Sequence, residues 1–482
     1  MRNLNGTCFV AFLVFTSIAG AQVPSTGINP SIERIVQSVS EQRIHSILEK
    51  LESFGTRHVM SAQDDPGQGI GAAMRWIHAE FQSYSSRLEV SYQPFKVKKA
   101  GAYARDADLA NVIAVLPGTS DPEKSILVSA HYDSVNYARK AVATEAERLA
   151  ELLRTGMEEN EARRYLQLFP PGEGAVDAEG TAAQVHAPGA ADDGSGTAVV
   201  LELARVMSQY RFDKTLVFIA FSAEEGAHAG SKAYVSEAKK AGRQIEAVLN
   251  NDIVGTDASG NGRSATDILR VYGEGPEDSG ARALMRYAKE ISERYVPSMR
   301  LELVFRLDRF NRGGDHMSFV DGGYAAVRFT SASENFANQH SGSDTLANTS
   351  APYTTRVARM NAAVAASLAL APTPPVVDWI FRSGTRKGER TPLLSRGSSG
   401  YDAVMQWQAS TAPDLAGYAV VMRPTTSPVW EKEIWVGNVS RYTLSDVSID
   451  DVVLGVKAVD RDGNPSLVSA YQEPPYRGAA AQ

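Results

Sequence analysis

The run from Thr215 to Phe221 constrains the fold more than any other stretch, because a nearly continuous apolar segment ends just before two adjacent carboxylates, Glu224 and Glu225. β-Branched and aromatic residues fill the run and charges follow only its carboxyl end, which predicts a strand buried on both faces of an α/β sheet. Open α/β sheets bind ligands at that end of their strands. Neighbouring side chains of an extended segment point in opposite directions, so the two glutamates can serve different purposes in one site.

A lone pair of glutamates is also typical of a solvated surface, so the residues that follow the other predicted strands decide between the two interpretations. Apolar runs at 126–130, 245–249 and 325–330 predict further strands, and a loop rich in Gly and Asp at 188–196 precedes a predicted helix at 197–210. Residues of types that bind metals occur in or just after these segments: His131 with Asp133, Asp192, Asp252 and His340.

Two of these positions have alternative interpretations. Asp133 lies two residues after His131 and shares its face of a strand, where a carboxylate fixes the tautomer of a metal-binding imidazole. A surface hydrogen bond is the simpler interpretation of this pair alone. In the loop rich in Gly and Asp, Asp193 lies nearer the helix start and is better placed as an N-cap, which leaves Asp192 as the candidate ligand.

The composition narrows the class of protein. A chain of 482 residues with 43% hydrophobic and 22% charged residues is typical of a soluble globular protein of two or three domains. The net charge of -7 and the absence of a long basic block argue against nucleic acid as the main partner.

Residues 1–21 resemble a removable signal peptide. Arg2 precedes an apolar run that is too short to span a bilayer, and Ala19-Gly20-Ala21 is a small-residue cleavage pattern. We therefore expect export to the periplasm or the medium, with no membrane span in the mature chain. Cys8 is the only cysteine and lies inside this segment, so a metal site must use His, Asp and Glu.

The remaining chain divides into two predicted domains. Residues 22–370 predict an α/β domain, a mixed, mainly parallel central sheet with helices on both faces, with a helical insertion at about 137–183 that either covers the cleft or decorates the surface. Residues 371–376 form a proline-rich linker. Residues 377–482 carry short alternating runs with turn signals, which predict an all-β sandwich. Trp407, 414–418 and 455–460 resemble a fibronectin type III domain.

The candidate ligands form a set of two histidines and three carboxylates without a thiolate, once one of the two glutamates is set aside for proton transfer. Such a set suits zinc, or less selectively manganese or cobalt. It exceeds what one tetrahedral ion with an open position needs, and it is about right for two ions that share a carboxylate.

The region from Ser53 to Leu370 resembles the di-zinc exopeptidases, which include secreted bacterial leucine-type aminopeptidases, glutamate carboxypeptidases and glutaminyl cyclases. The segments that carry the resemblance are His131-Tyr132-Asp133-Ser134, Asp192-Asp193-Gly194-Ser195-Gly196, Glu224-Glu225-Gly226, Asn251-Asp252, and His340 before Asp344-Thr345.

The resemblance implies a role for each of these side chains. His131 and Asp252 would bind one zinc ion, Glu225 and His340 the other, and Asp192 would bridge the two. Glu224 would be the general base that takes a proton from a water shared by the ions and delivers it to the leaving amine, and Asp133 would orient His131.

The implied function is that of a secreted zinc aminopeptidase acting on peptides. The alternatives are a glutaminyl-cyclase-like aminoacyltransferase, a di-zinc carboxypeptidase and a binding ectodomain without activity. One departure concerns the oxyanion: Gln339 precedes His340 where the aminopeptidases commonly have a Tyr, so Gln339, His316 or a residue of the insertion would replace it. Asp315 resembles an acid that supports the ligands in the family's Asp-His-x-x-Phe loop.

Overall fold

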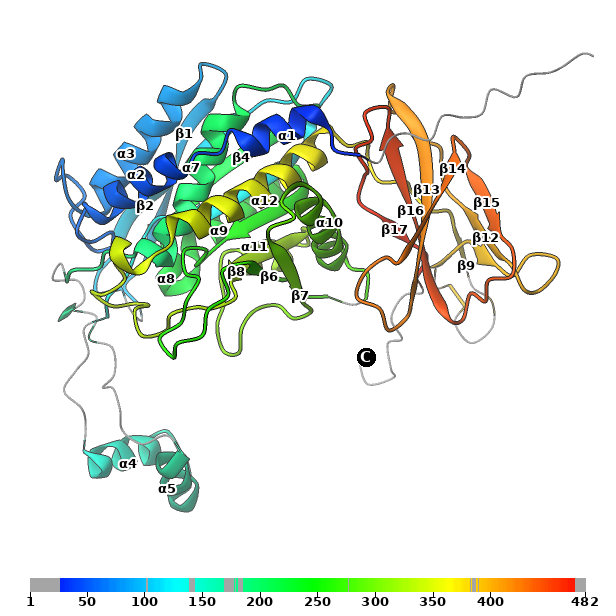
Figure 1. The fold of residues 1–482 in the computed structure, drawn as a ribbon. Coiled ribbons are helices and arrows are strands. Elements are labelled where there is room, and N and C mark those ends of the chain that lie inside the picture. The colour runs from blue at the N-terminus through cyan, green and yellow to red at the C-terminus, as the bar shows by residue number, and fades with distance from the viewer. Residues whose placement is uncertain are drawn as a thin grey trace, which may run out of the picture.

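The computed structural model describes residues 27–100, 103–137, 144–168, 177, 179–180, 185–275, 277–381, 383, 387–388 and 390–472. The predicted signal segment 1–21, with Cys8, lies outside the described residues. Two bodies, one on each side of residues 371–376, make up the fold in Figure 1.

The first body is built on a sheet of eight strands in the order β1-β2-β4-β3-β5-β8-β6-β7. The central strands β4, β3, β5 and β8 are parallel to one another, whereas β1, β2 and β6 each pair antiparallel with a neighbour. This arrangement confirms the predicted mixed, mainly parallel sheet. The strands are β1 (Glu89–Val97), β2 (Ala107–Leu116), β3 (Asp121–His131), β4 (Lys214–Phe221), β5 (Gln244–Asn251), β6 (Ile268–Tyr272), β7 (Arg300–Val304) and β8 (Ala326–Ser331).

Strand β4 is buried along its whole length, as its apolar sequence predicts. Alternate residues belong to two separate cores, with Phe218 in the larger core on one face and Ile219 in the smaller core on the other. The period of two along a strand produces this division.

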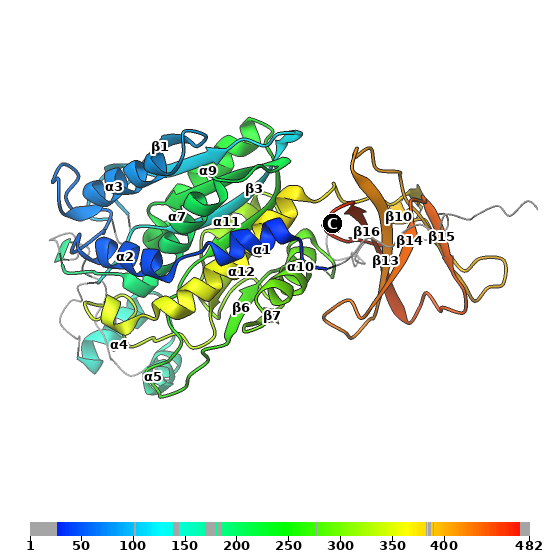
Figure 2. The same ribbon diagram turned by 45° about the horizontal axis from the view of Figure 1, so that its top comes forward.

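Helices cover both faces of the sheet (Figure 2). The larger core is formed with α1 (Pro30–Gln37), α2 (Glu41–Glu52), α3 (Gly69–Tyr84), α7 (Ser195–Met207), α10 (Gly280–Tyr295) and α12 (Ala351–Leu370). The smaller core is formed with α9 (Ala229–Lys240) and α11 (His316–Asp321). The predicted N-cap Ser40 accepts a hydrogen bond from the backbone of Arg43 at the start of α2.

The predicted insertion contains two helices, α4 (Glu145–Arg154) and α5 (Glu159–Leu168). The capping box between Thr144 and Glu147 begins α4 as the sequence predicts. Leu152 and Leu166 lie in a small core between these two helices, and Figure 1 shows the pair apart from the sheet.

The second body consists mainly of two antiparallel sheets, β11-β12-β15 and β14-β13-β16-β17. A core that includes Trp407 and Tyr418, whose rings are 5.4 Å apart, lies between them. The predicted all-β sandwich is thereby confirmed, whereas the fibronectin resemblance stays a prediction. The strands are β9 (Trp379–Phe381), β10 (Arg390–Pro392), β11 (Leu394–Ser395), β12 (Ala403–Gln406), β13 (Leu415–Pro424), β14 (Lys432–Gly437), β15 (Arg441–Leu444), β16 (Val452–Asp460) and β17 (Ser469–Ala470).

Charged groups join the two bodies. The buried guanidinium of Arg423 on β13 donates to Glu277 Oε1 at 2.6 Å and to Asp278 Oδ2 at 2.9 Å, just before α10. Arg286 on α10 donates to Pro428 O at 2.8 Å. In the described part of the chain, no helix is both long enough and apolar enough to cross a membrane.

Candidate metal centre

Three neighbouring parallel strands end at one edge of the sheet and deliver candidate ligands there. Strand β3 lies between β4 and β5 and ends at His131. Glu224 and Glu225 follow β4, and Asp252 follows β5. The carboxyl ends of parallel strands lie side by side, so this convergence follows from the pairing of the strands.

Asp192 reaches the same edge from η1 (Ala190–Gly194), the irregular turn before α7. Asp344 fixes this turn, because its carboxylate accepts hydrogen bonds from the backbone N–H groups of Ala191 and Asp192, each at 2.9 Å. Burial raises the pKa of Asp344 to about 7, although these N–H groups lower it.

The neighbouring Asp193 points into the protein and ties three segments together. Its carboxylate accepts from the backbone N–H groups of Gly196 at 2.9 Å, His131 at 3.2 Å and Ile253 at 3.2 Å. Gly194 and not Asp193 is the N-cap residue of α7, but the bond from Gly196 still satisfies a backbone N–H group in the first turn of that helix. It also leaves Asp192 as the aspartate of this pair that faces the candidate ligands.

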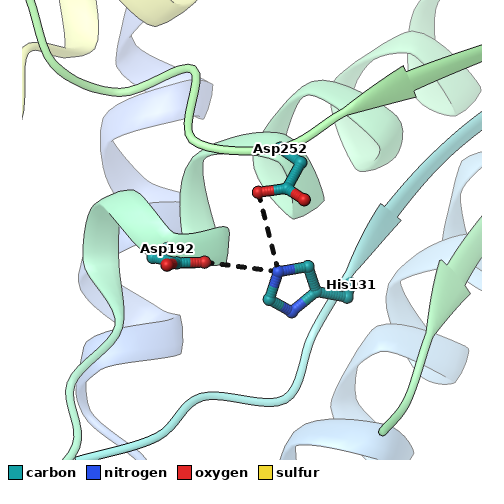
Figure 3. Close-up of side chains that lie close together, drawn as sticks. All are labelled: His131, Asp192 and Asp252. Atoms are coloured by element: carbon teal, nitrogen blue, oxygen red, sulfur yellow. Dashed lines mark ion pairs between the residues drawn. The ribbon is translucent and has the colours of Figure 1, made fainter. Parts of the chain in front are cut away.

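His131, Asp192 and Asp252 form the first ligand group, and Figure 3 shows their side chains directed toward one another. His131 Nε2 lies 3.3 Å from Asp192 Oδ1 and 3.9 Å from Asp252 Oδ1. All three side chains are buried.

Asp192, Glu225 and His340 form the second ligand group. His340 Nε2 lies 3.2 Å from Asp192 Oδ2 and 3.1 Å from Glu225 Oε2. The two oxygens of Asp192 therefore face different imidazoles, the geometry expected of a bridging carboxylate. The five predicted ligands converge as the sequence indicates.

Glu224 lies beside both groups without belonging to either of them. Its Oε2 is 3.9 Å from His131 Nε2, and its Oε1 is 3.4 Å from His228 Nε2. The expectation of an extended segment here is wrong, because Glu224–Ala227 is a short helix, α8. Consecutive helical residues still differ in direction by about 100°, so the two glutamates face different neighbours.

Asp133 contacts His131 in a different way from the one predicted. The His131 Nδ1 hydrogen bond is to the backbone oxygen of Asp133 at 3.1 Å, whereas the carboxylate Oδ1 is 3.6 Å away. The carboxylate accepts from the backbone N–H groups of Glu224 at 3.2 Å and Glu225 at 3.3 Å. Asp133 thus orients His131 through its carbonyl group and holds the start of α8 through its side chain.

The donor set fits metal ions. Ligand atoms about 2.0–2.2 Å from a tetrahedral ion lie roughly 3.3–3.6 Å from one another, close to most of the separations found here. His131 Nε2 and Glu225 Oε1 are buried and have no hydrogen-bond partner among the described residues. Burial raises the pKa of Glu225 to about 7 and that of Asp252 to about 6, so bound cations would relieve this crowding of carboxylates.

The cavity above the centre has a volume of about 250 Å³ and includes residues that the sequence analysis missed. His228 and Tyr137 line it beside the ligands, and Tyr137 packs edge-on against His340 with ring centroids 5.7 Å apart. Three arginines, Arg309, Arg312 and Arg328, line it as well. Of these residues, only Arg328 could have been noticed in the sequence, because a charged residue is unusual within an apolar run such as the one that predicts β8.

Of the groups that the sequence offered for the oxyanion, Gln339 and His316 are occupied elsewhere, whereas Tyr137, in the cavity, belongs to the third, the insertion at about 137–183. The Gln339 side chain accepts from Arg312 Nη1 at 2.7 Å and donates to Glu334 Oε2 at 3.0 Å. His316 is buried and contacts Leu307 O at 2.8 Å. Asp315 is also buried, and burial raises its pKa to about 7.

Comparison with known proteins identifies the family. Residues 111–365, more than half of the chain, match the family described as Peptidase family M28. The chain belongs to peptidase family M28. This M28 peptidase is 32% identical to a probable zinc metalloprotease of Pyricularia oryzae, over 93% of this chain and 85% of that protein. It is 30% identical to a probable zinc metalloprotease of Leptosphaeria maculans, over 89% of this chain and 94% of that protein.

A solved structure shares the fold of this M28 peptidase. LapB from Legionella pneumophila superposes with a TM-score of 0.50 over 70% of this chain and 75% of that chain, at 19% sequence identity. This likeness concerns the fold alone. The family match confirms the resemblance predicted from the motifs and the prediction that the chain is an enzyme, a peptidase.

Proposed function

We propose that this M28 peptidase is an exported aminopeptidase that binds two zinc ions. His131 and Asp252 would hold one ion, Glu225 and His340 the other, and Asp192 both. The observation that carries the proposal is the pair of ligand groups that share Asp192, each with its ligand atoms within 4.8 Å of one another. The names of the relatives, probable zinc metalloproteases, support the choice of metal.

Glu224 is positioned to move the proton. Burial would raise the pKa of Glu224, but His131 and His228 lower it below its ordinary value, so the group is a carboxylate ready to accept a proton. Bound zinc would supply polarisation of the scissile carbonyl and a lowered pKa for the attacking water. Glu224 takes the proton of that water and delivers it to the leaving amine, which a group that binds no metal is free to do.

Tyr137 is our candidate for the group that stabilises the oxyanion. Of the described residues that line the cavity, it carries the only hydroxyl group. That hydroxyl now donates to the backbone oxygen of Glu225 at 2.5 Å, which holds it beside the ligands. A donor at this place would lower the barrier by stabilising developing negative charge on the substrate.

Paired variants test the metal centre. Glu224→Ala should retain the zinc content of the native enzyme and lose turnover, because Glu224 acts only on protons. Glu225→Ala should lose zinc as well as turnover, because it removes a ligand. Zinc is measured per chain after purification without added metal. A loss of zinc in Glu224→Ala alone would mean that the roles of the two glutamates are reversed.

Substrates with blocked termini test the reaction. An aminopeptidase should release the first residue from peptides whose carboxyl terminus is amidated and leave N-acetylated peptides intact. A carboxypeptidase should show the opposite pattern, and a glutaminyl-cyclase-like enzyme should cyclise N-terminal Gln instead of hydrolysing aminoacyl amides. A zinc-free chain without any turnover would support the binding ectodomain.

A further inference from the structure

One wall of the cavity is basic, and the proposed zinc chemistry does not use it. The loop between β7 and α11 contributes Arg309, Asn311 and Arg312, and β8 contributes Arg328. Among the described lining residues, the only carboxylates are the candidate ligands Asp192, Glu225 and Asp252 and the candidate general base Glu224.

Two of the three arginines are neutralised by buried carboxylates. Arg328, whose side chain is 1% exposed, lies 2.7 Å from Asp252 Oδ1 and 2.9 Å from Asp308 Oδ2. Arg309 contacts Asp308 Oδ1 at 2.9 Å and Glu334 Oε2 at 2.6 Å. These contacts fix both guanidinium groups within the wall.

Arg312 differs from its two neighbours. Its side chain is 28% exposed, and the nearest carboxylate in an ion pair, that of Glu334, is 3.7 Å away. In the described part of the protein, its one side-chain hydrogen bond is from Nη1 to Gln339 Oε1 at 2.7 Å. The three guanidinium groups share the carboxylates of Asp252, Asp308 and Glu334. Arg312 is the most exposed of the three arginines, and its ion pair is the longest.

Gln339 holds this guanidinium in place. Its amide oxygen accepts from Arg312 while its Nε2 donates to Glu334 at 3.0 Å, and the next residue is the candidate ligand His340. Arg312 also lies over the exposed ring of Phe336, 5.8 Å from its centroid. A guanidinium restrained in this way loses little conformational entropy when it binds a ligand, so its Nε and Nη2 groups are preorganised to donate hydrogen bonds to an anion.

We propose that Arg312 binds a carboxylate of the substrate next to the scissile bond, so that the preferred substrates are short peptides with a free carboxyl group at that place. This inference rests on the proposed function. Guanidinium and carboxylate groups pair through two parallel hydrogen bonds, which gives both specificity and affinity. Arg312 lines the same cavity of about 250 Å³ as the candidate ligands Asp192, Glu225, Asp252 and His340. The terminal carboxylate of a dipeptide, or an acidic side chain in the second position, is the substrate carboxylate nearest to a scissile bond held there.

The test compares three substrates that share the same first residue. They are Leu-Leu with a free carboxyl group, its amide Leu-Leu-NH2, and Leu-Glu-NH2, in which only the side chain is anionic. The native enzyme should have a kcat/KM for at least one carboxylate substrate about 10- to 100-fold above that for Leu-Leu-NH2, the factor expected for one charge-assisted hydrogen-bonded pair. Preference for Leu-Leu assigns the terminal carboxylate, and preference for Leu-Glu-NH2 assigns the side chain.

Variants attribute this preference to Arg312. Arg312→Met should abolish it by raising KM for the carboxylate substrate while leaving Leu-Leu-NH2 unchanged, and Arg312→Lys should retain part of it because the charge remains without the planar fork. Arg306→Met is the matched control, because Arg306 is an exposed arginine of the same loop that does not line the cavity. Zinc content and the melting temperature verify that each variant is folded and loaded.

Two results would overturn the inference while the proposed function stands. The first is equal hydrolysis of all three substrates by the native enzyme. The second is a loss of kcat in Arg312→Met that is the same for every substrate, which would indicate a role in stabilising the oxyanion. A zinc-loaded native enzyme that hydrolyses no peptide would instead refute the proposed function itself.

Discussion

His228 offers the sharpest test of how the general base is held. It lies between α8 and α9 with a left-handed backbone (φ 54°), and its Nε2 is 3.4 Å from Glu224 Oε1. This contact leaves Glu224 Oε2 on the side of His131. We expect His228 to act through Glu224, by fixing which carboxylate oxygen accepts the proton.

The size of the effect follows from the geometry. A hydrogen bond between charged groups contributes about 1.5–3 kcal/mol, and the lower end applies here because the contact is long and 24% of the His228 side chain is exposed. About 1.5 kcal/mol corresponds to roughly a tenfold change in rate. We therefore expect His228→Leu to lower kcat about tenfold, with KM and zinc content unchanged, and His228→Gln to recover part of the loss because its amide can donate.

The pH profile separates this role from a structural one. His228 lowers the pKa of Glu224, so its removal should raise that pKa and move the acidic limb of the kcat profile to higher pH, since the base must be deprotonated to work. His78→Leu is the control, because His78 on α3 stacks on Tyr92 outside the cavity. Native kcat together with an unmoved acidic limb in His228→Leu would refute the reasoning.

Three further predictions concern the oxyanion, acid stability and the joint between the two bodies. Tyr137→Phe should lower kcat roughly 10²-fold at unchanged zinc content, and an unaltered kcat in stopped-flow or steady-state assays would exclude the proposed role. Burial lowers the pKa of His58 to about 4, so the neutral side chain stabilises the fold above the unfolded pKa of about 6.5 and this stability is lost as the pH falls toward 4. His58→Asn should therefore reduce, by up to about 3 kcal/mol, the loss in free energy of unfolding on acidification, measured by urea unfolding. An identical pH dependence in the variant would contradict this. Arg423→Met should lower the free energy of unfolding by about 3 kcal/mol, the lower end of the range for breaking a buried ion pair, because the Glu277 side chain is 43% exposed. An unchanged melting temperature and unchanged proteolysis at 371–376 would show that the two bodies do not depend on this contact.

Three of the five candidate ligands, His131, Glu225 and Asp252, could be recognised from the sequence because they lie at or just after the ends of strands. His131 and Asp252 follow apolar runs that identify β3 and β5, and parallel strands bring their carboxyl ends together whatever the rest of the chain does. Local signals also located the helix caps at Ser40 and Thr144. Strands β6 and β7 were not predicted, because they are short and charged residues such as Arg270 interrupt the apolar pattern.

The surroundings of the ligands were decided by the tertiary structure. The pairing of Arg328 with Asp252, the hold of Gln339 on Arg312 and the contact between His228 and Glu224 each depend on where loops place side chains. The periodicity of a strand or helix reports which face a residue occupies, but carries no information about which distant residue it will meet. For this reason the sequence by itself identified a candidate metal-binding set and the resemblance to a peptidase family, whereas only the tertiary structure placed three arginines beside that set.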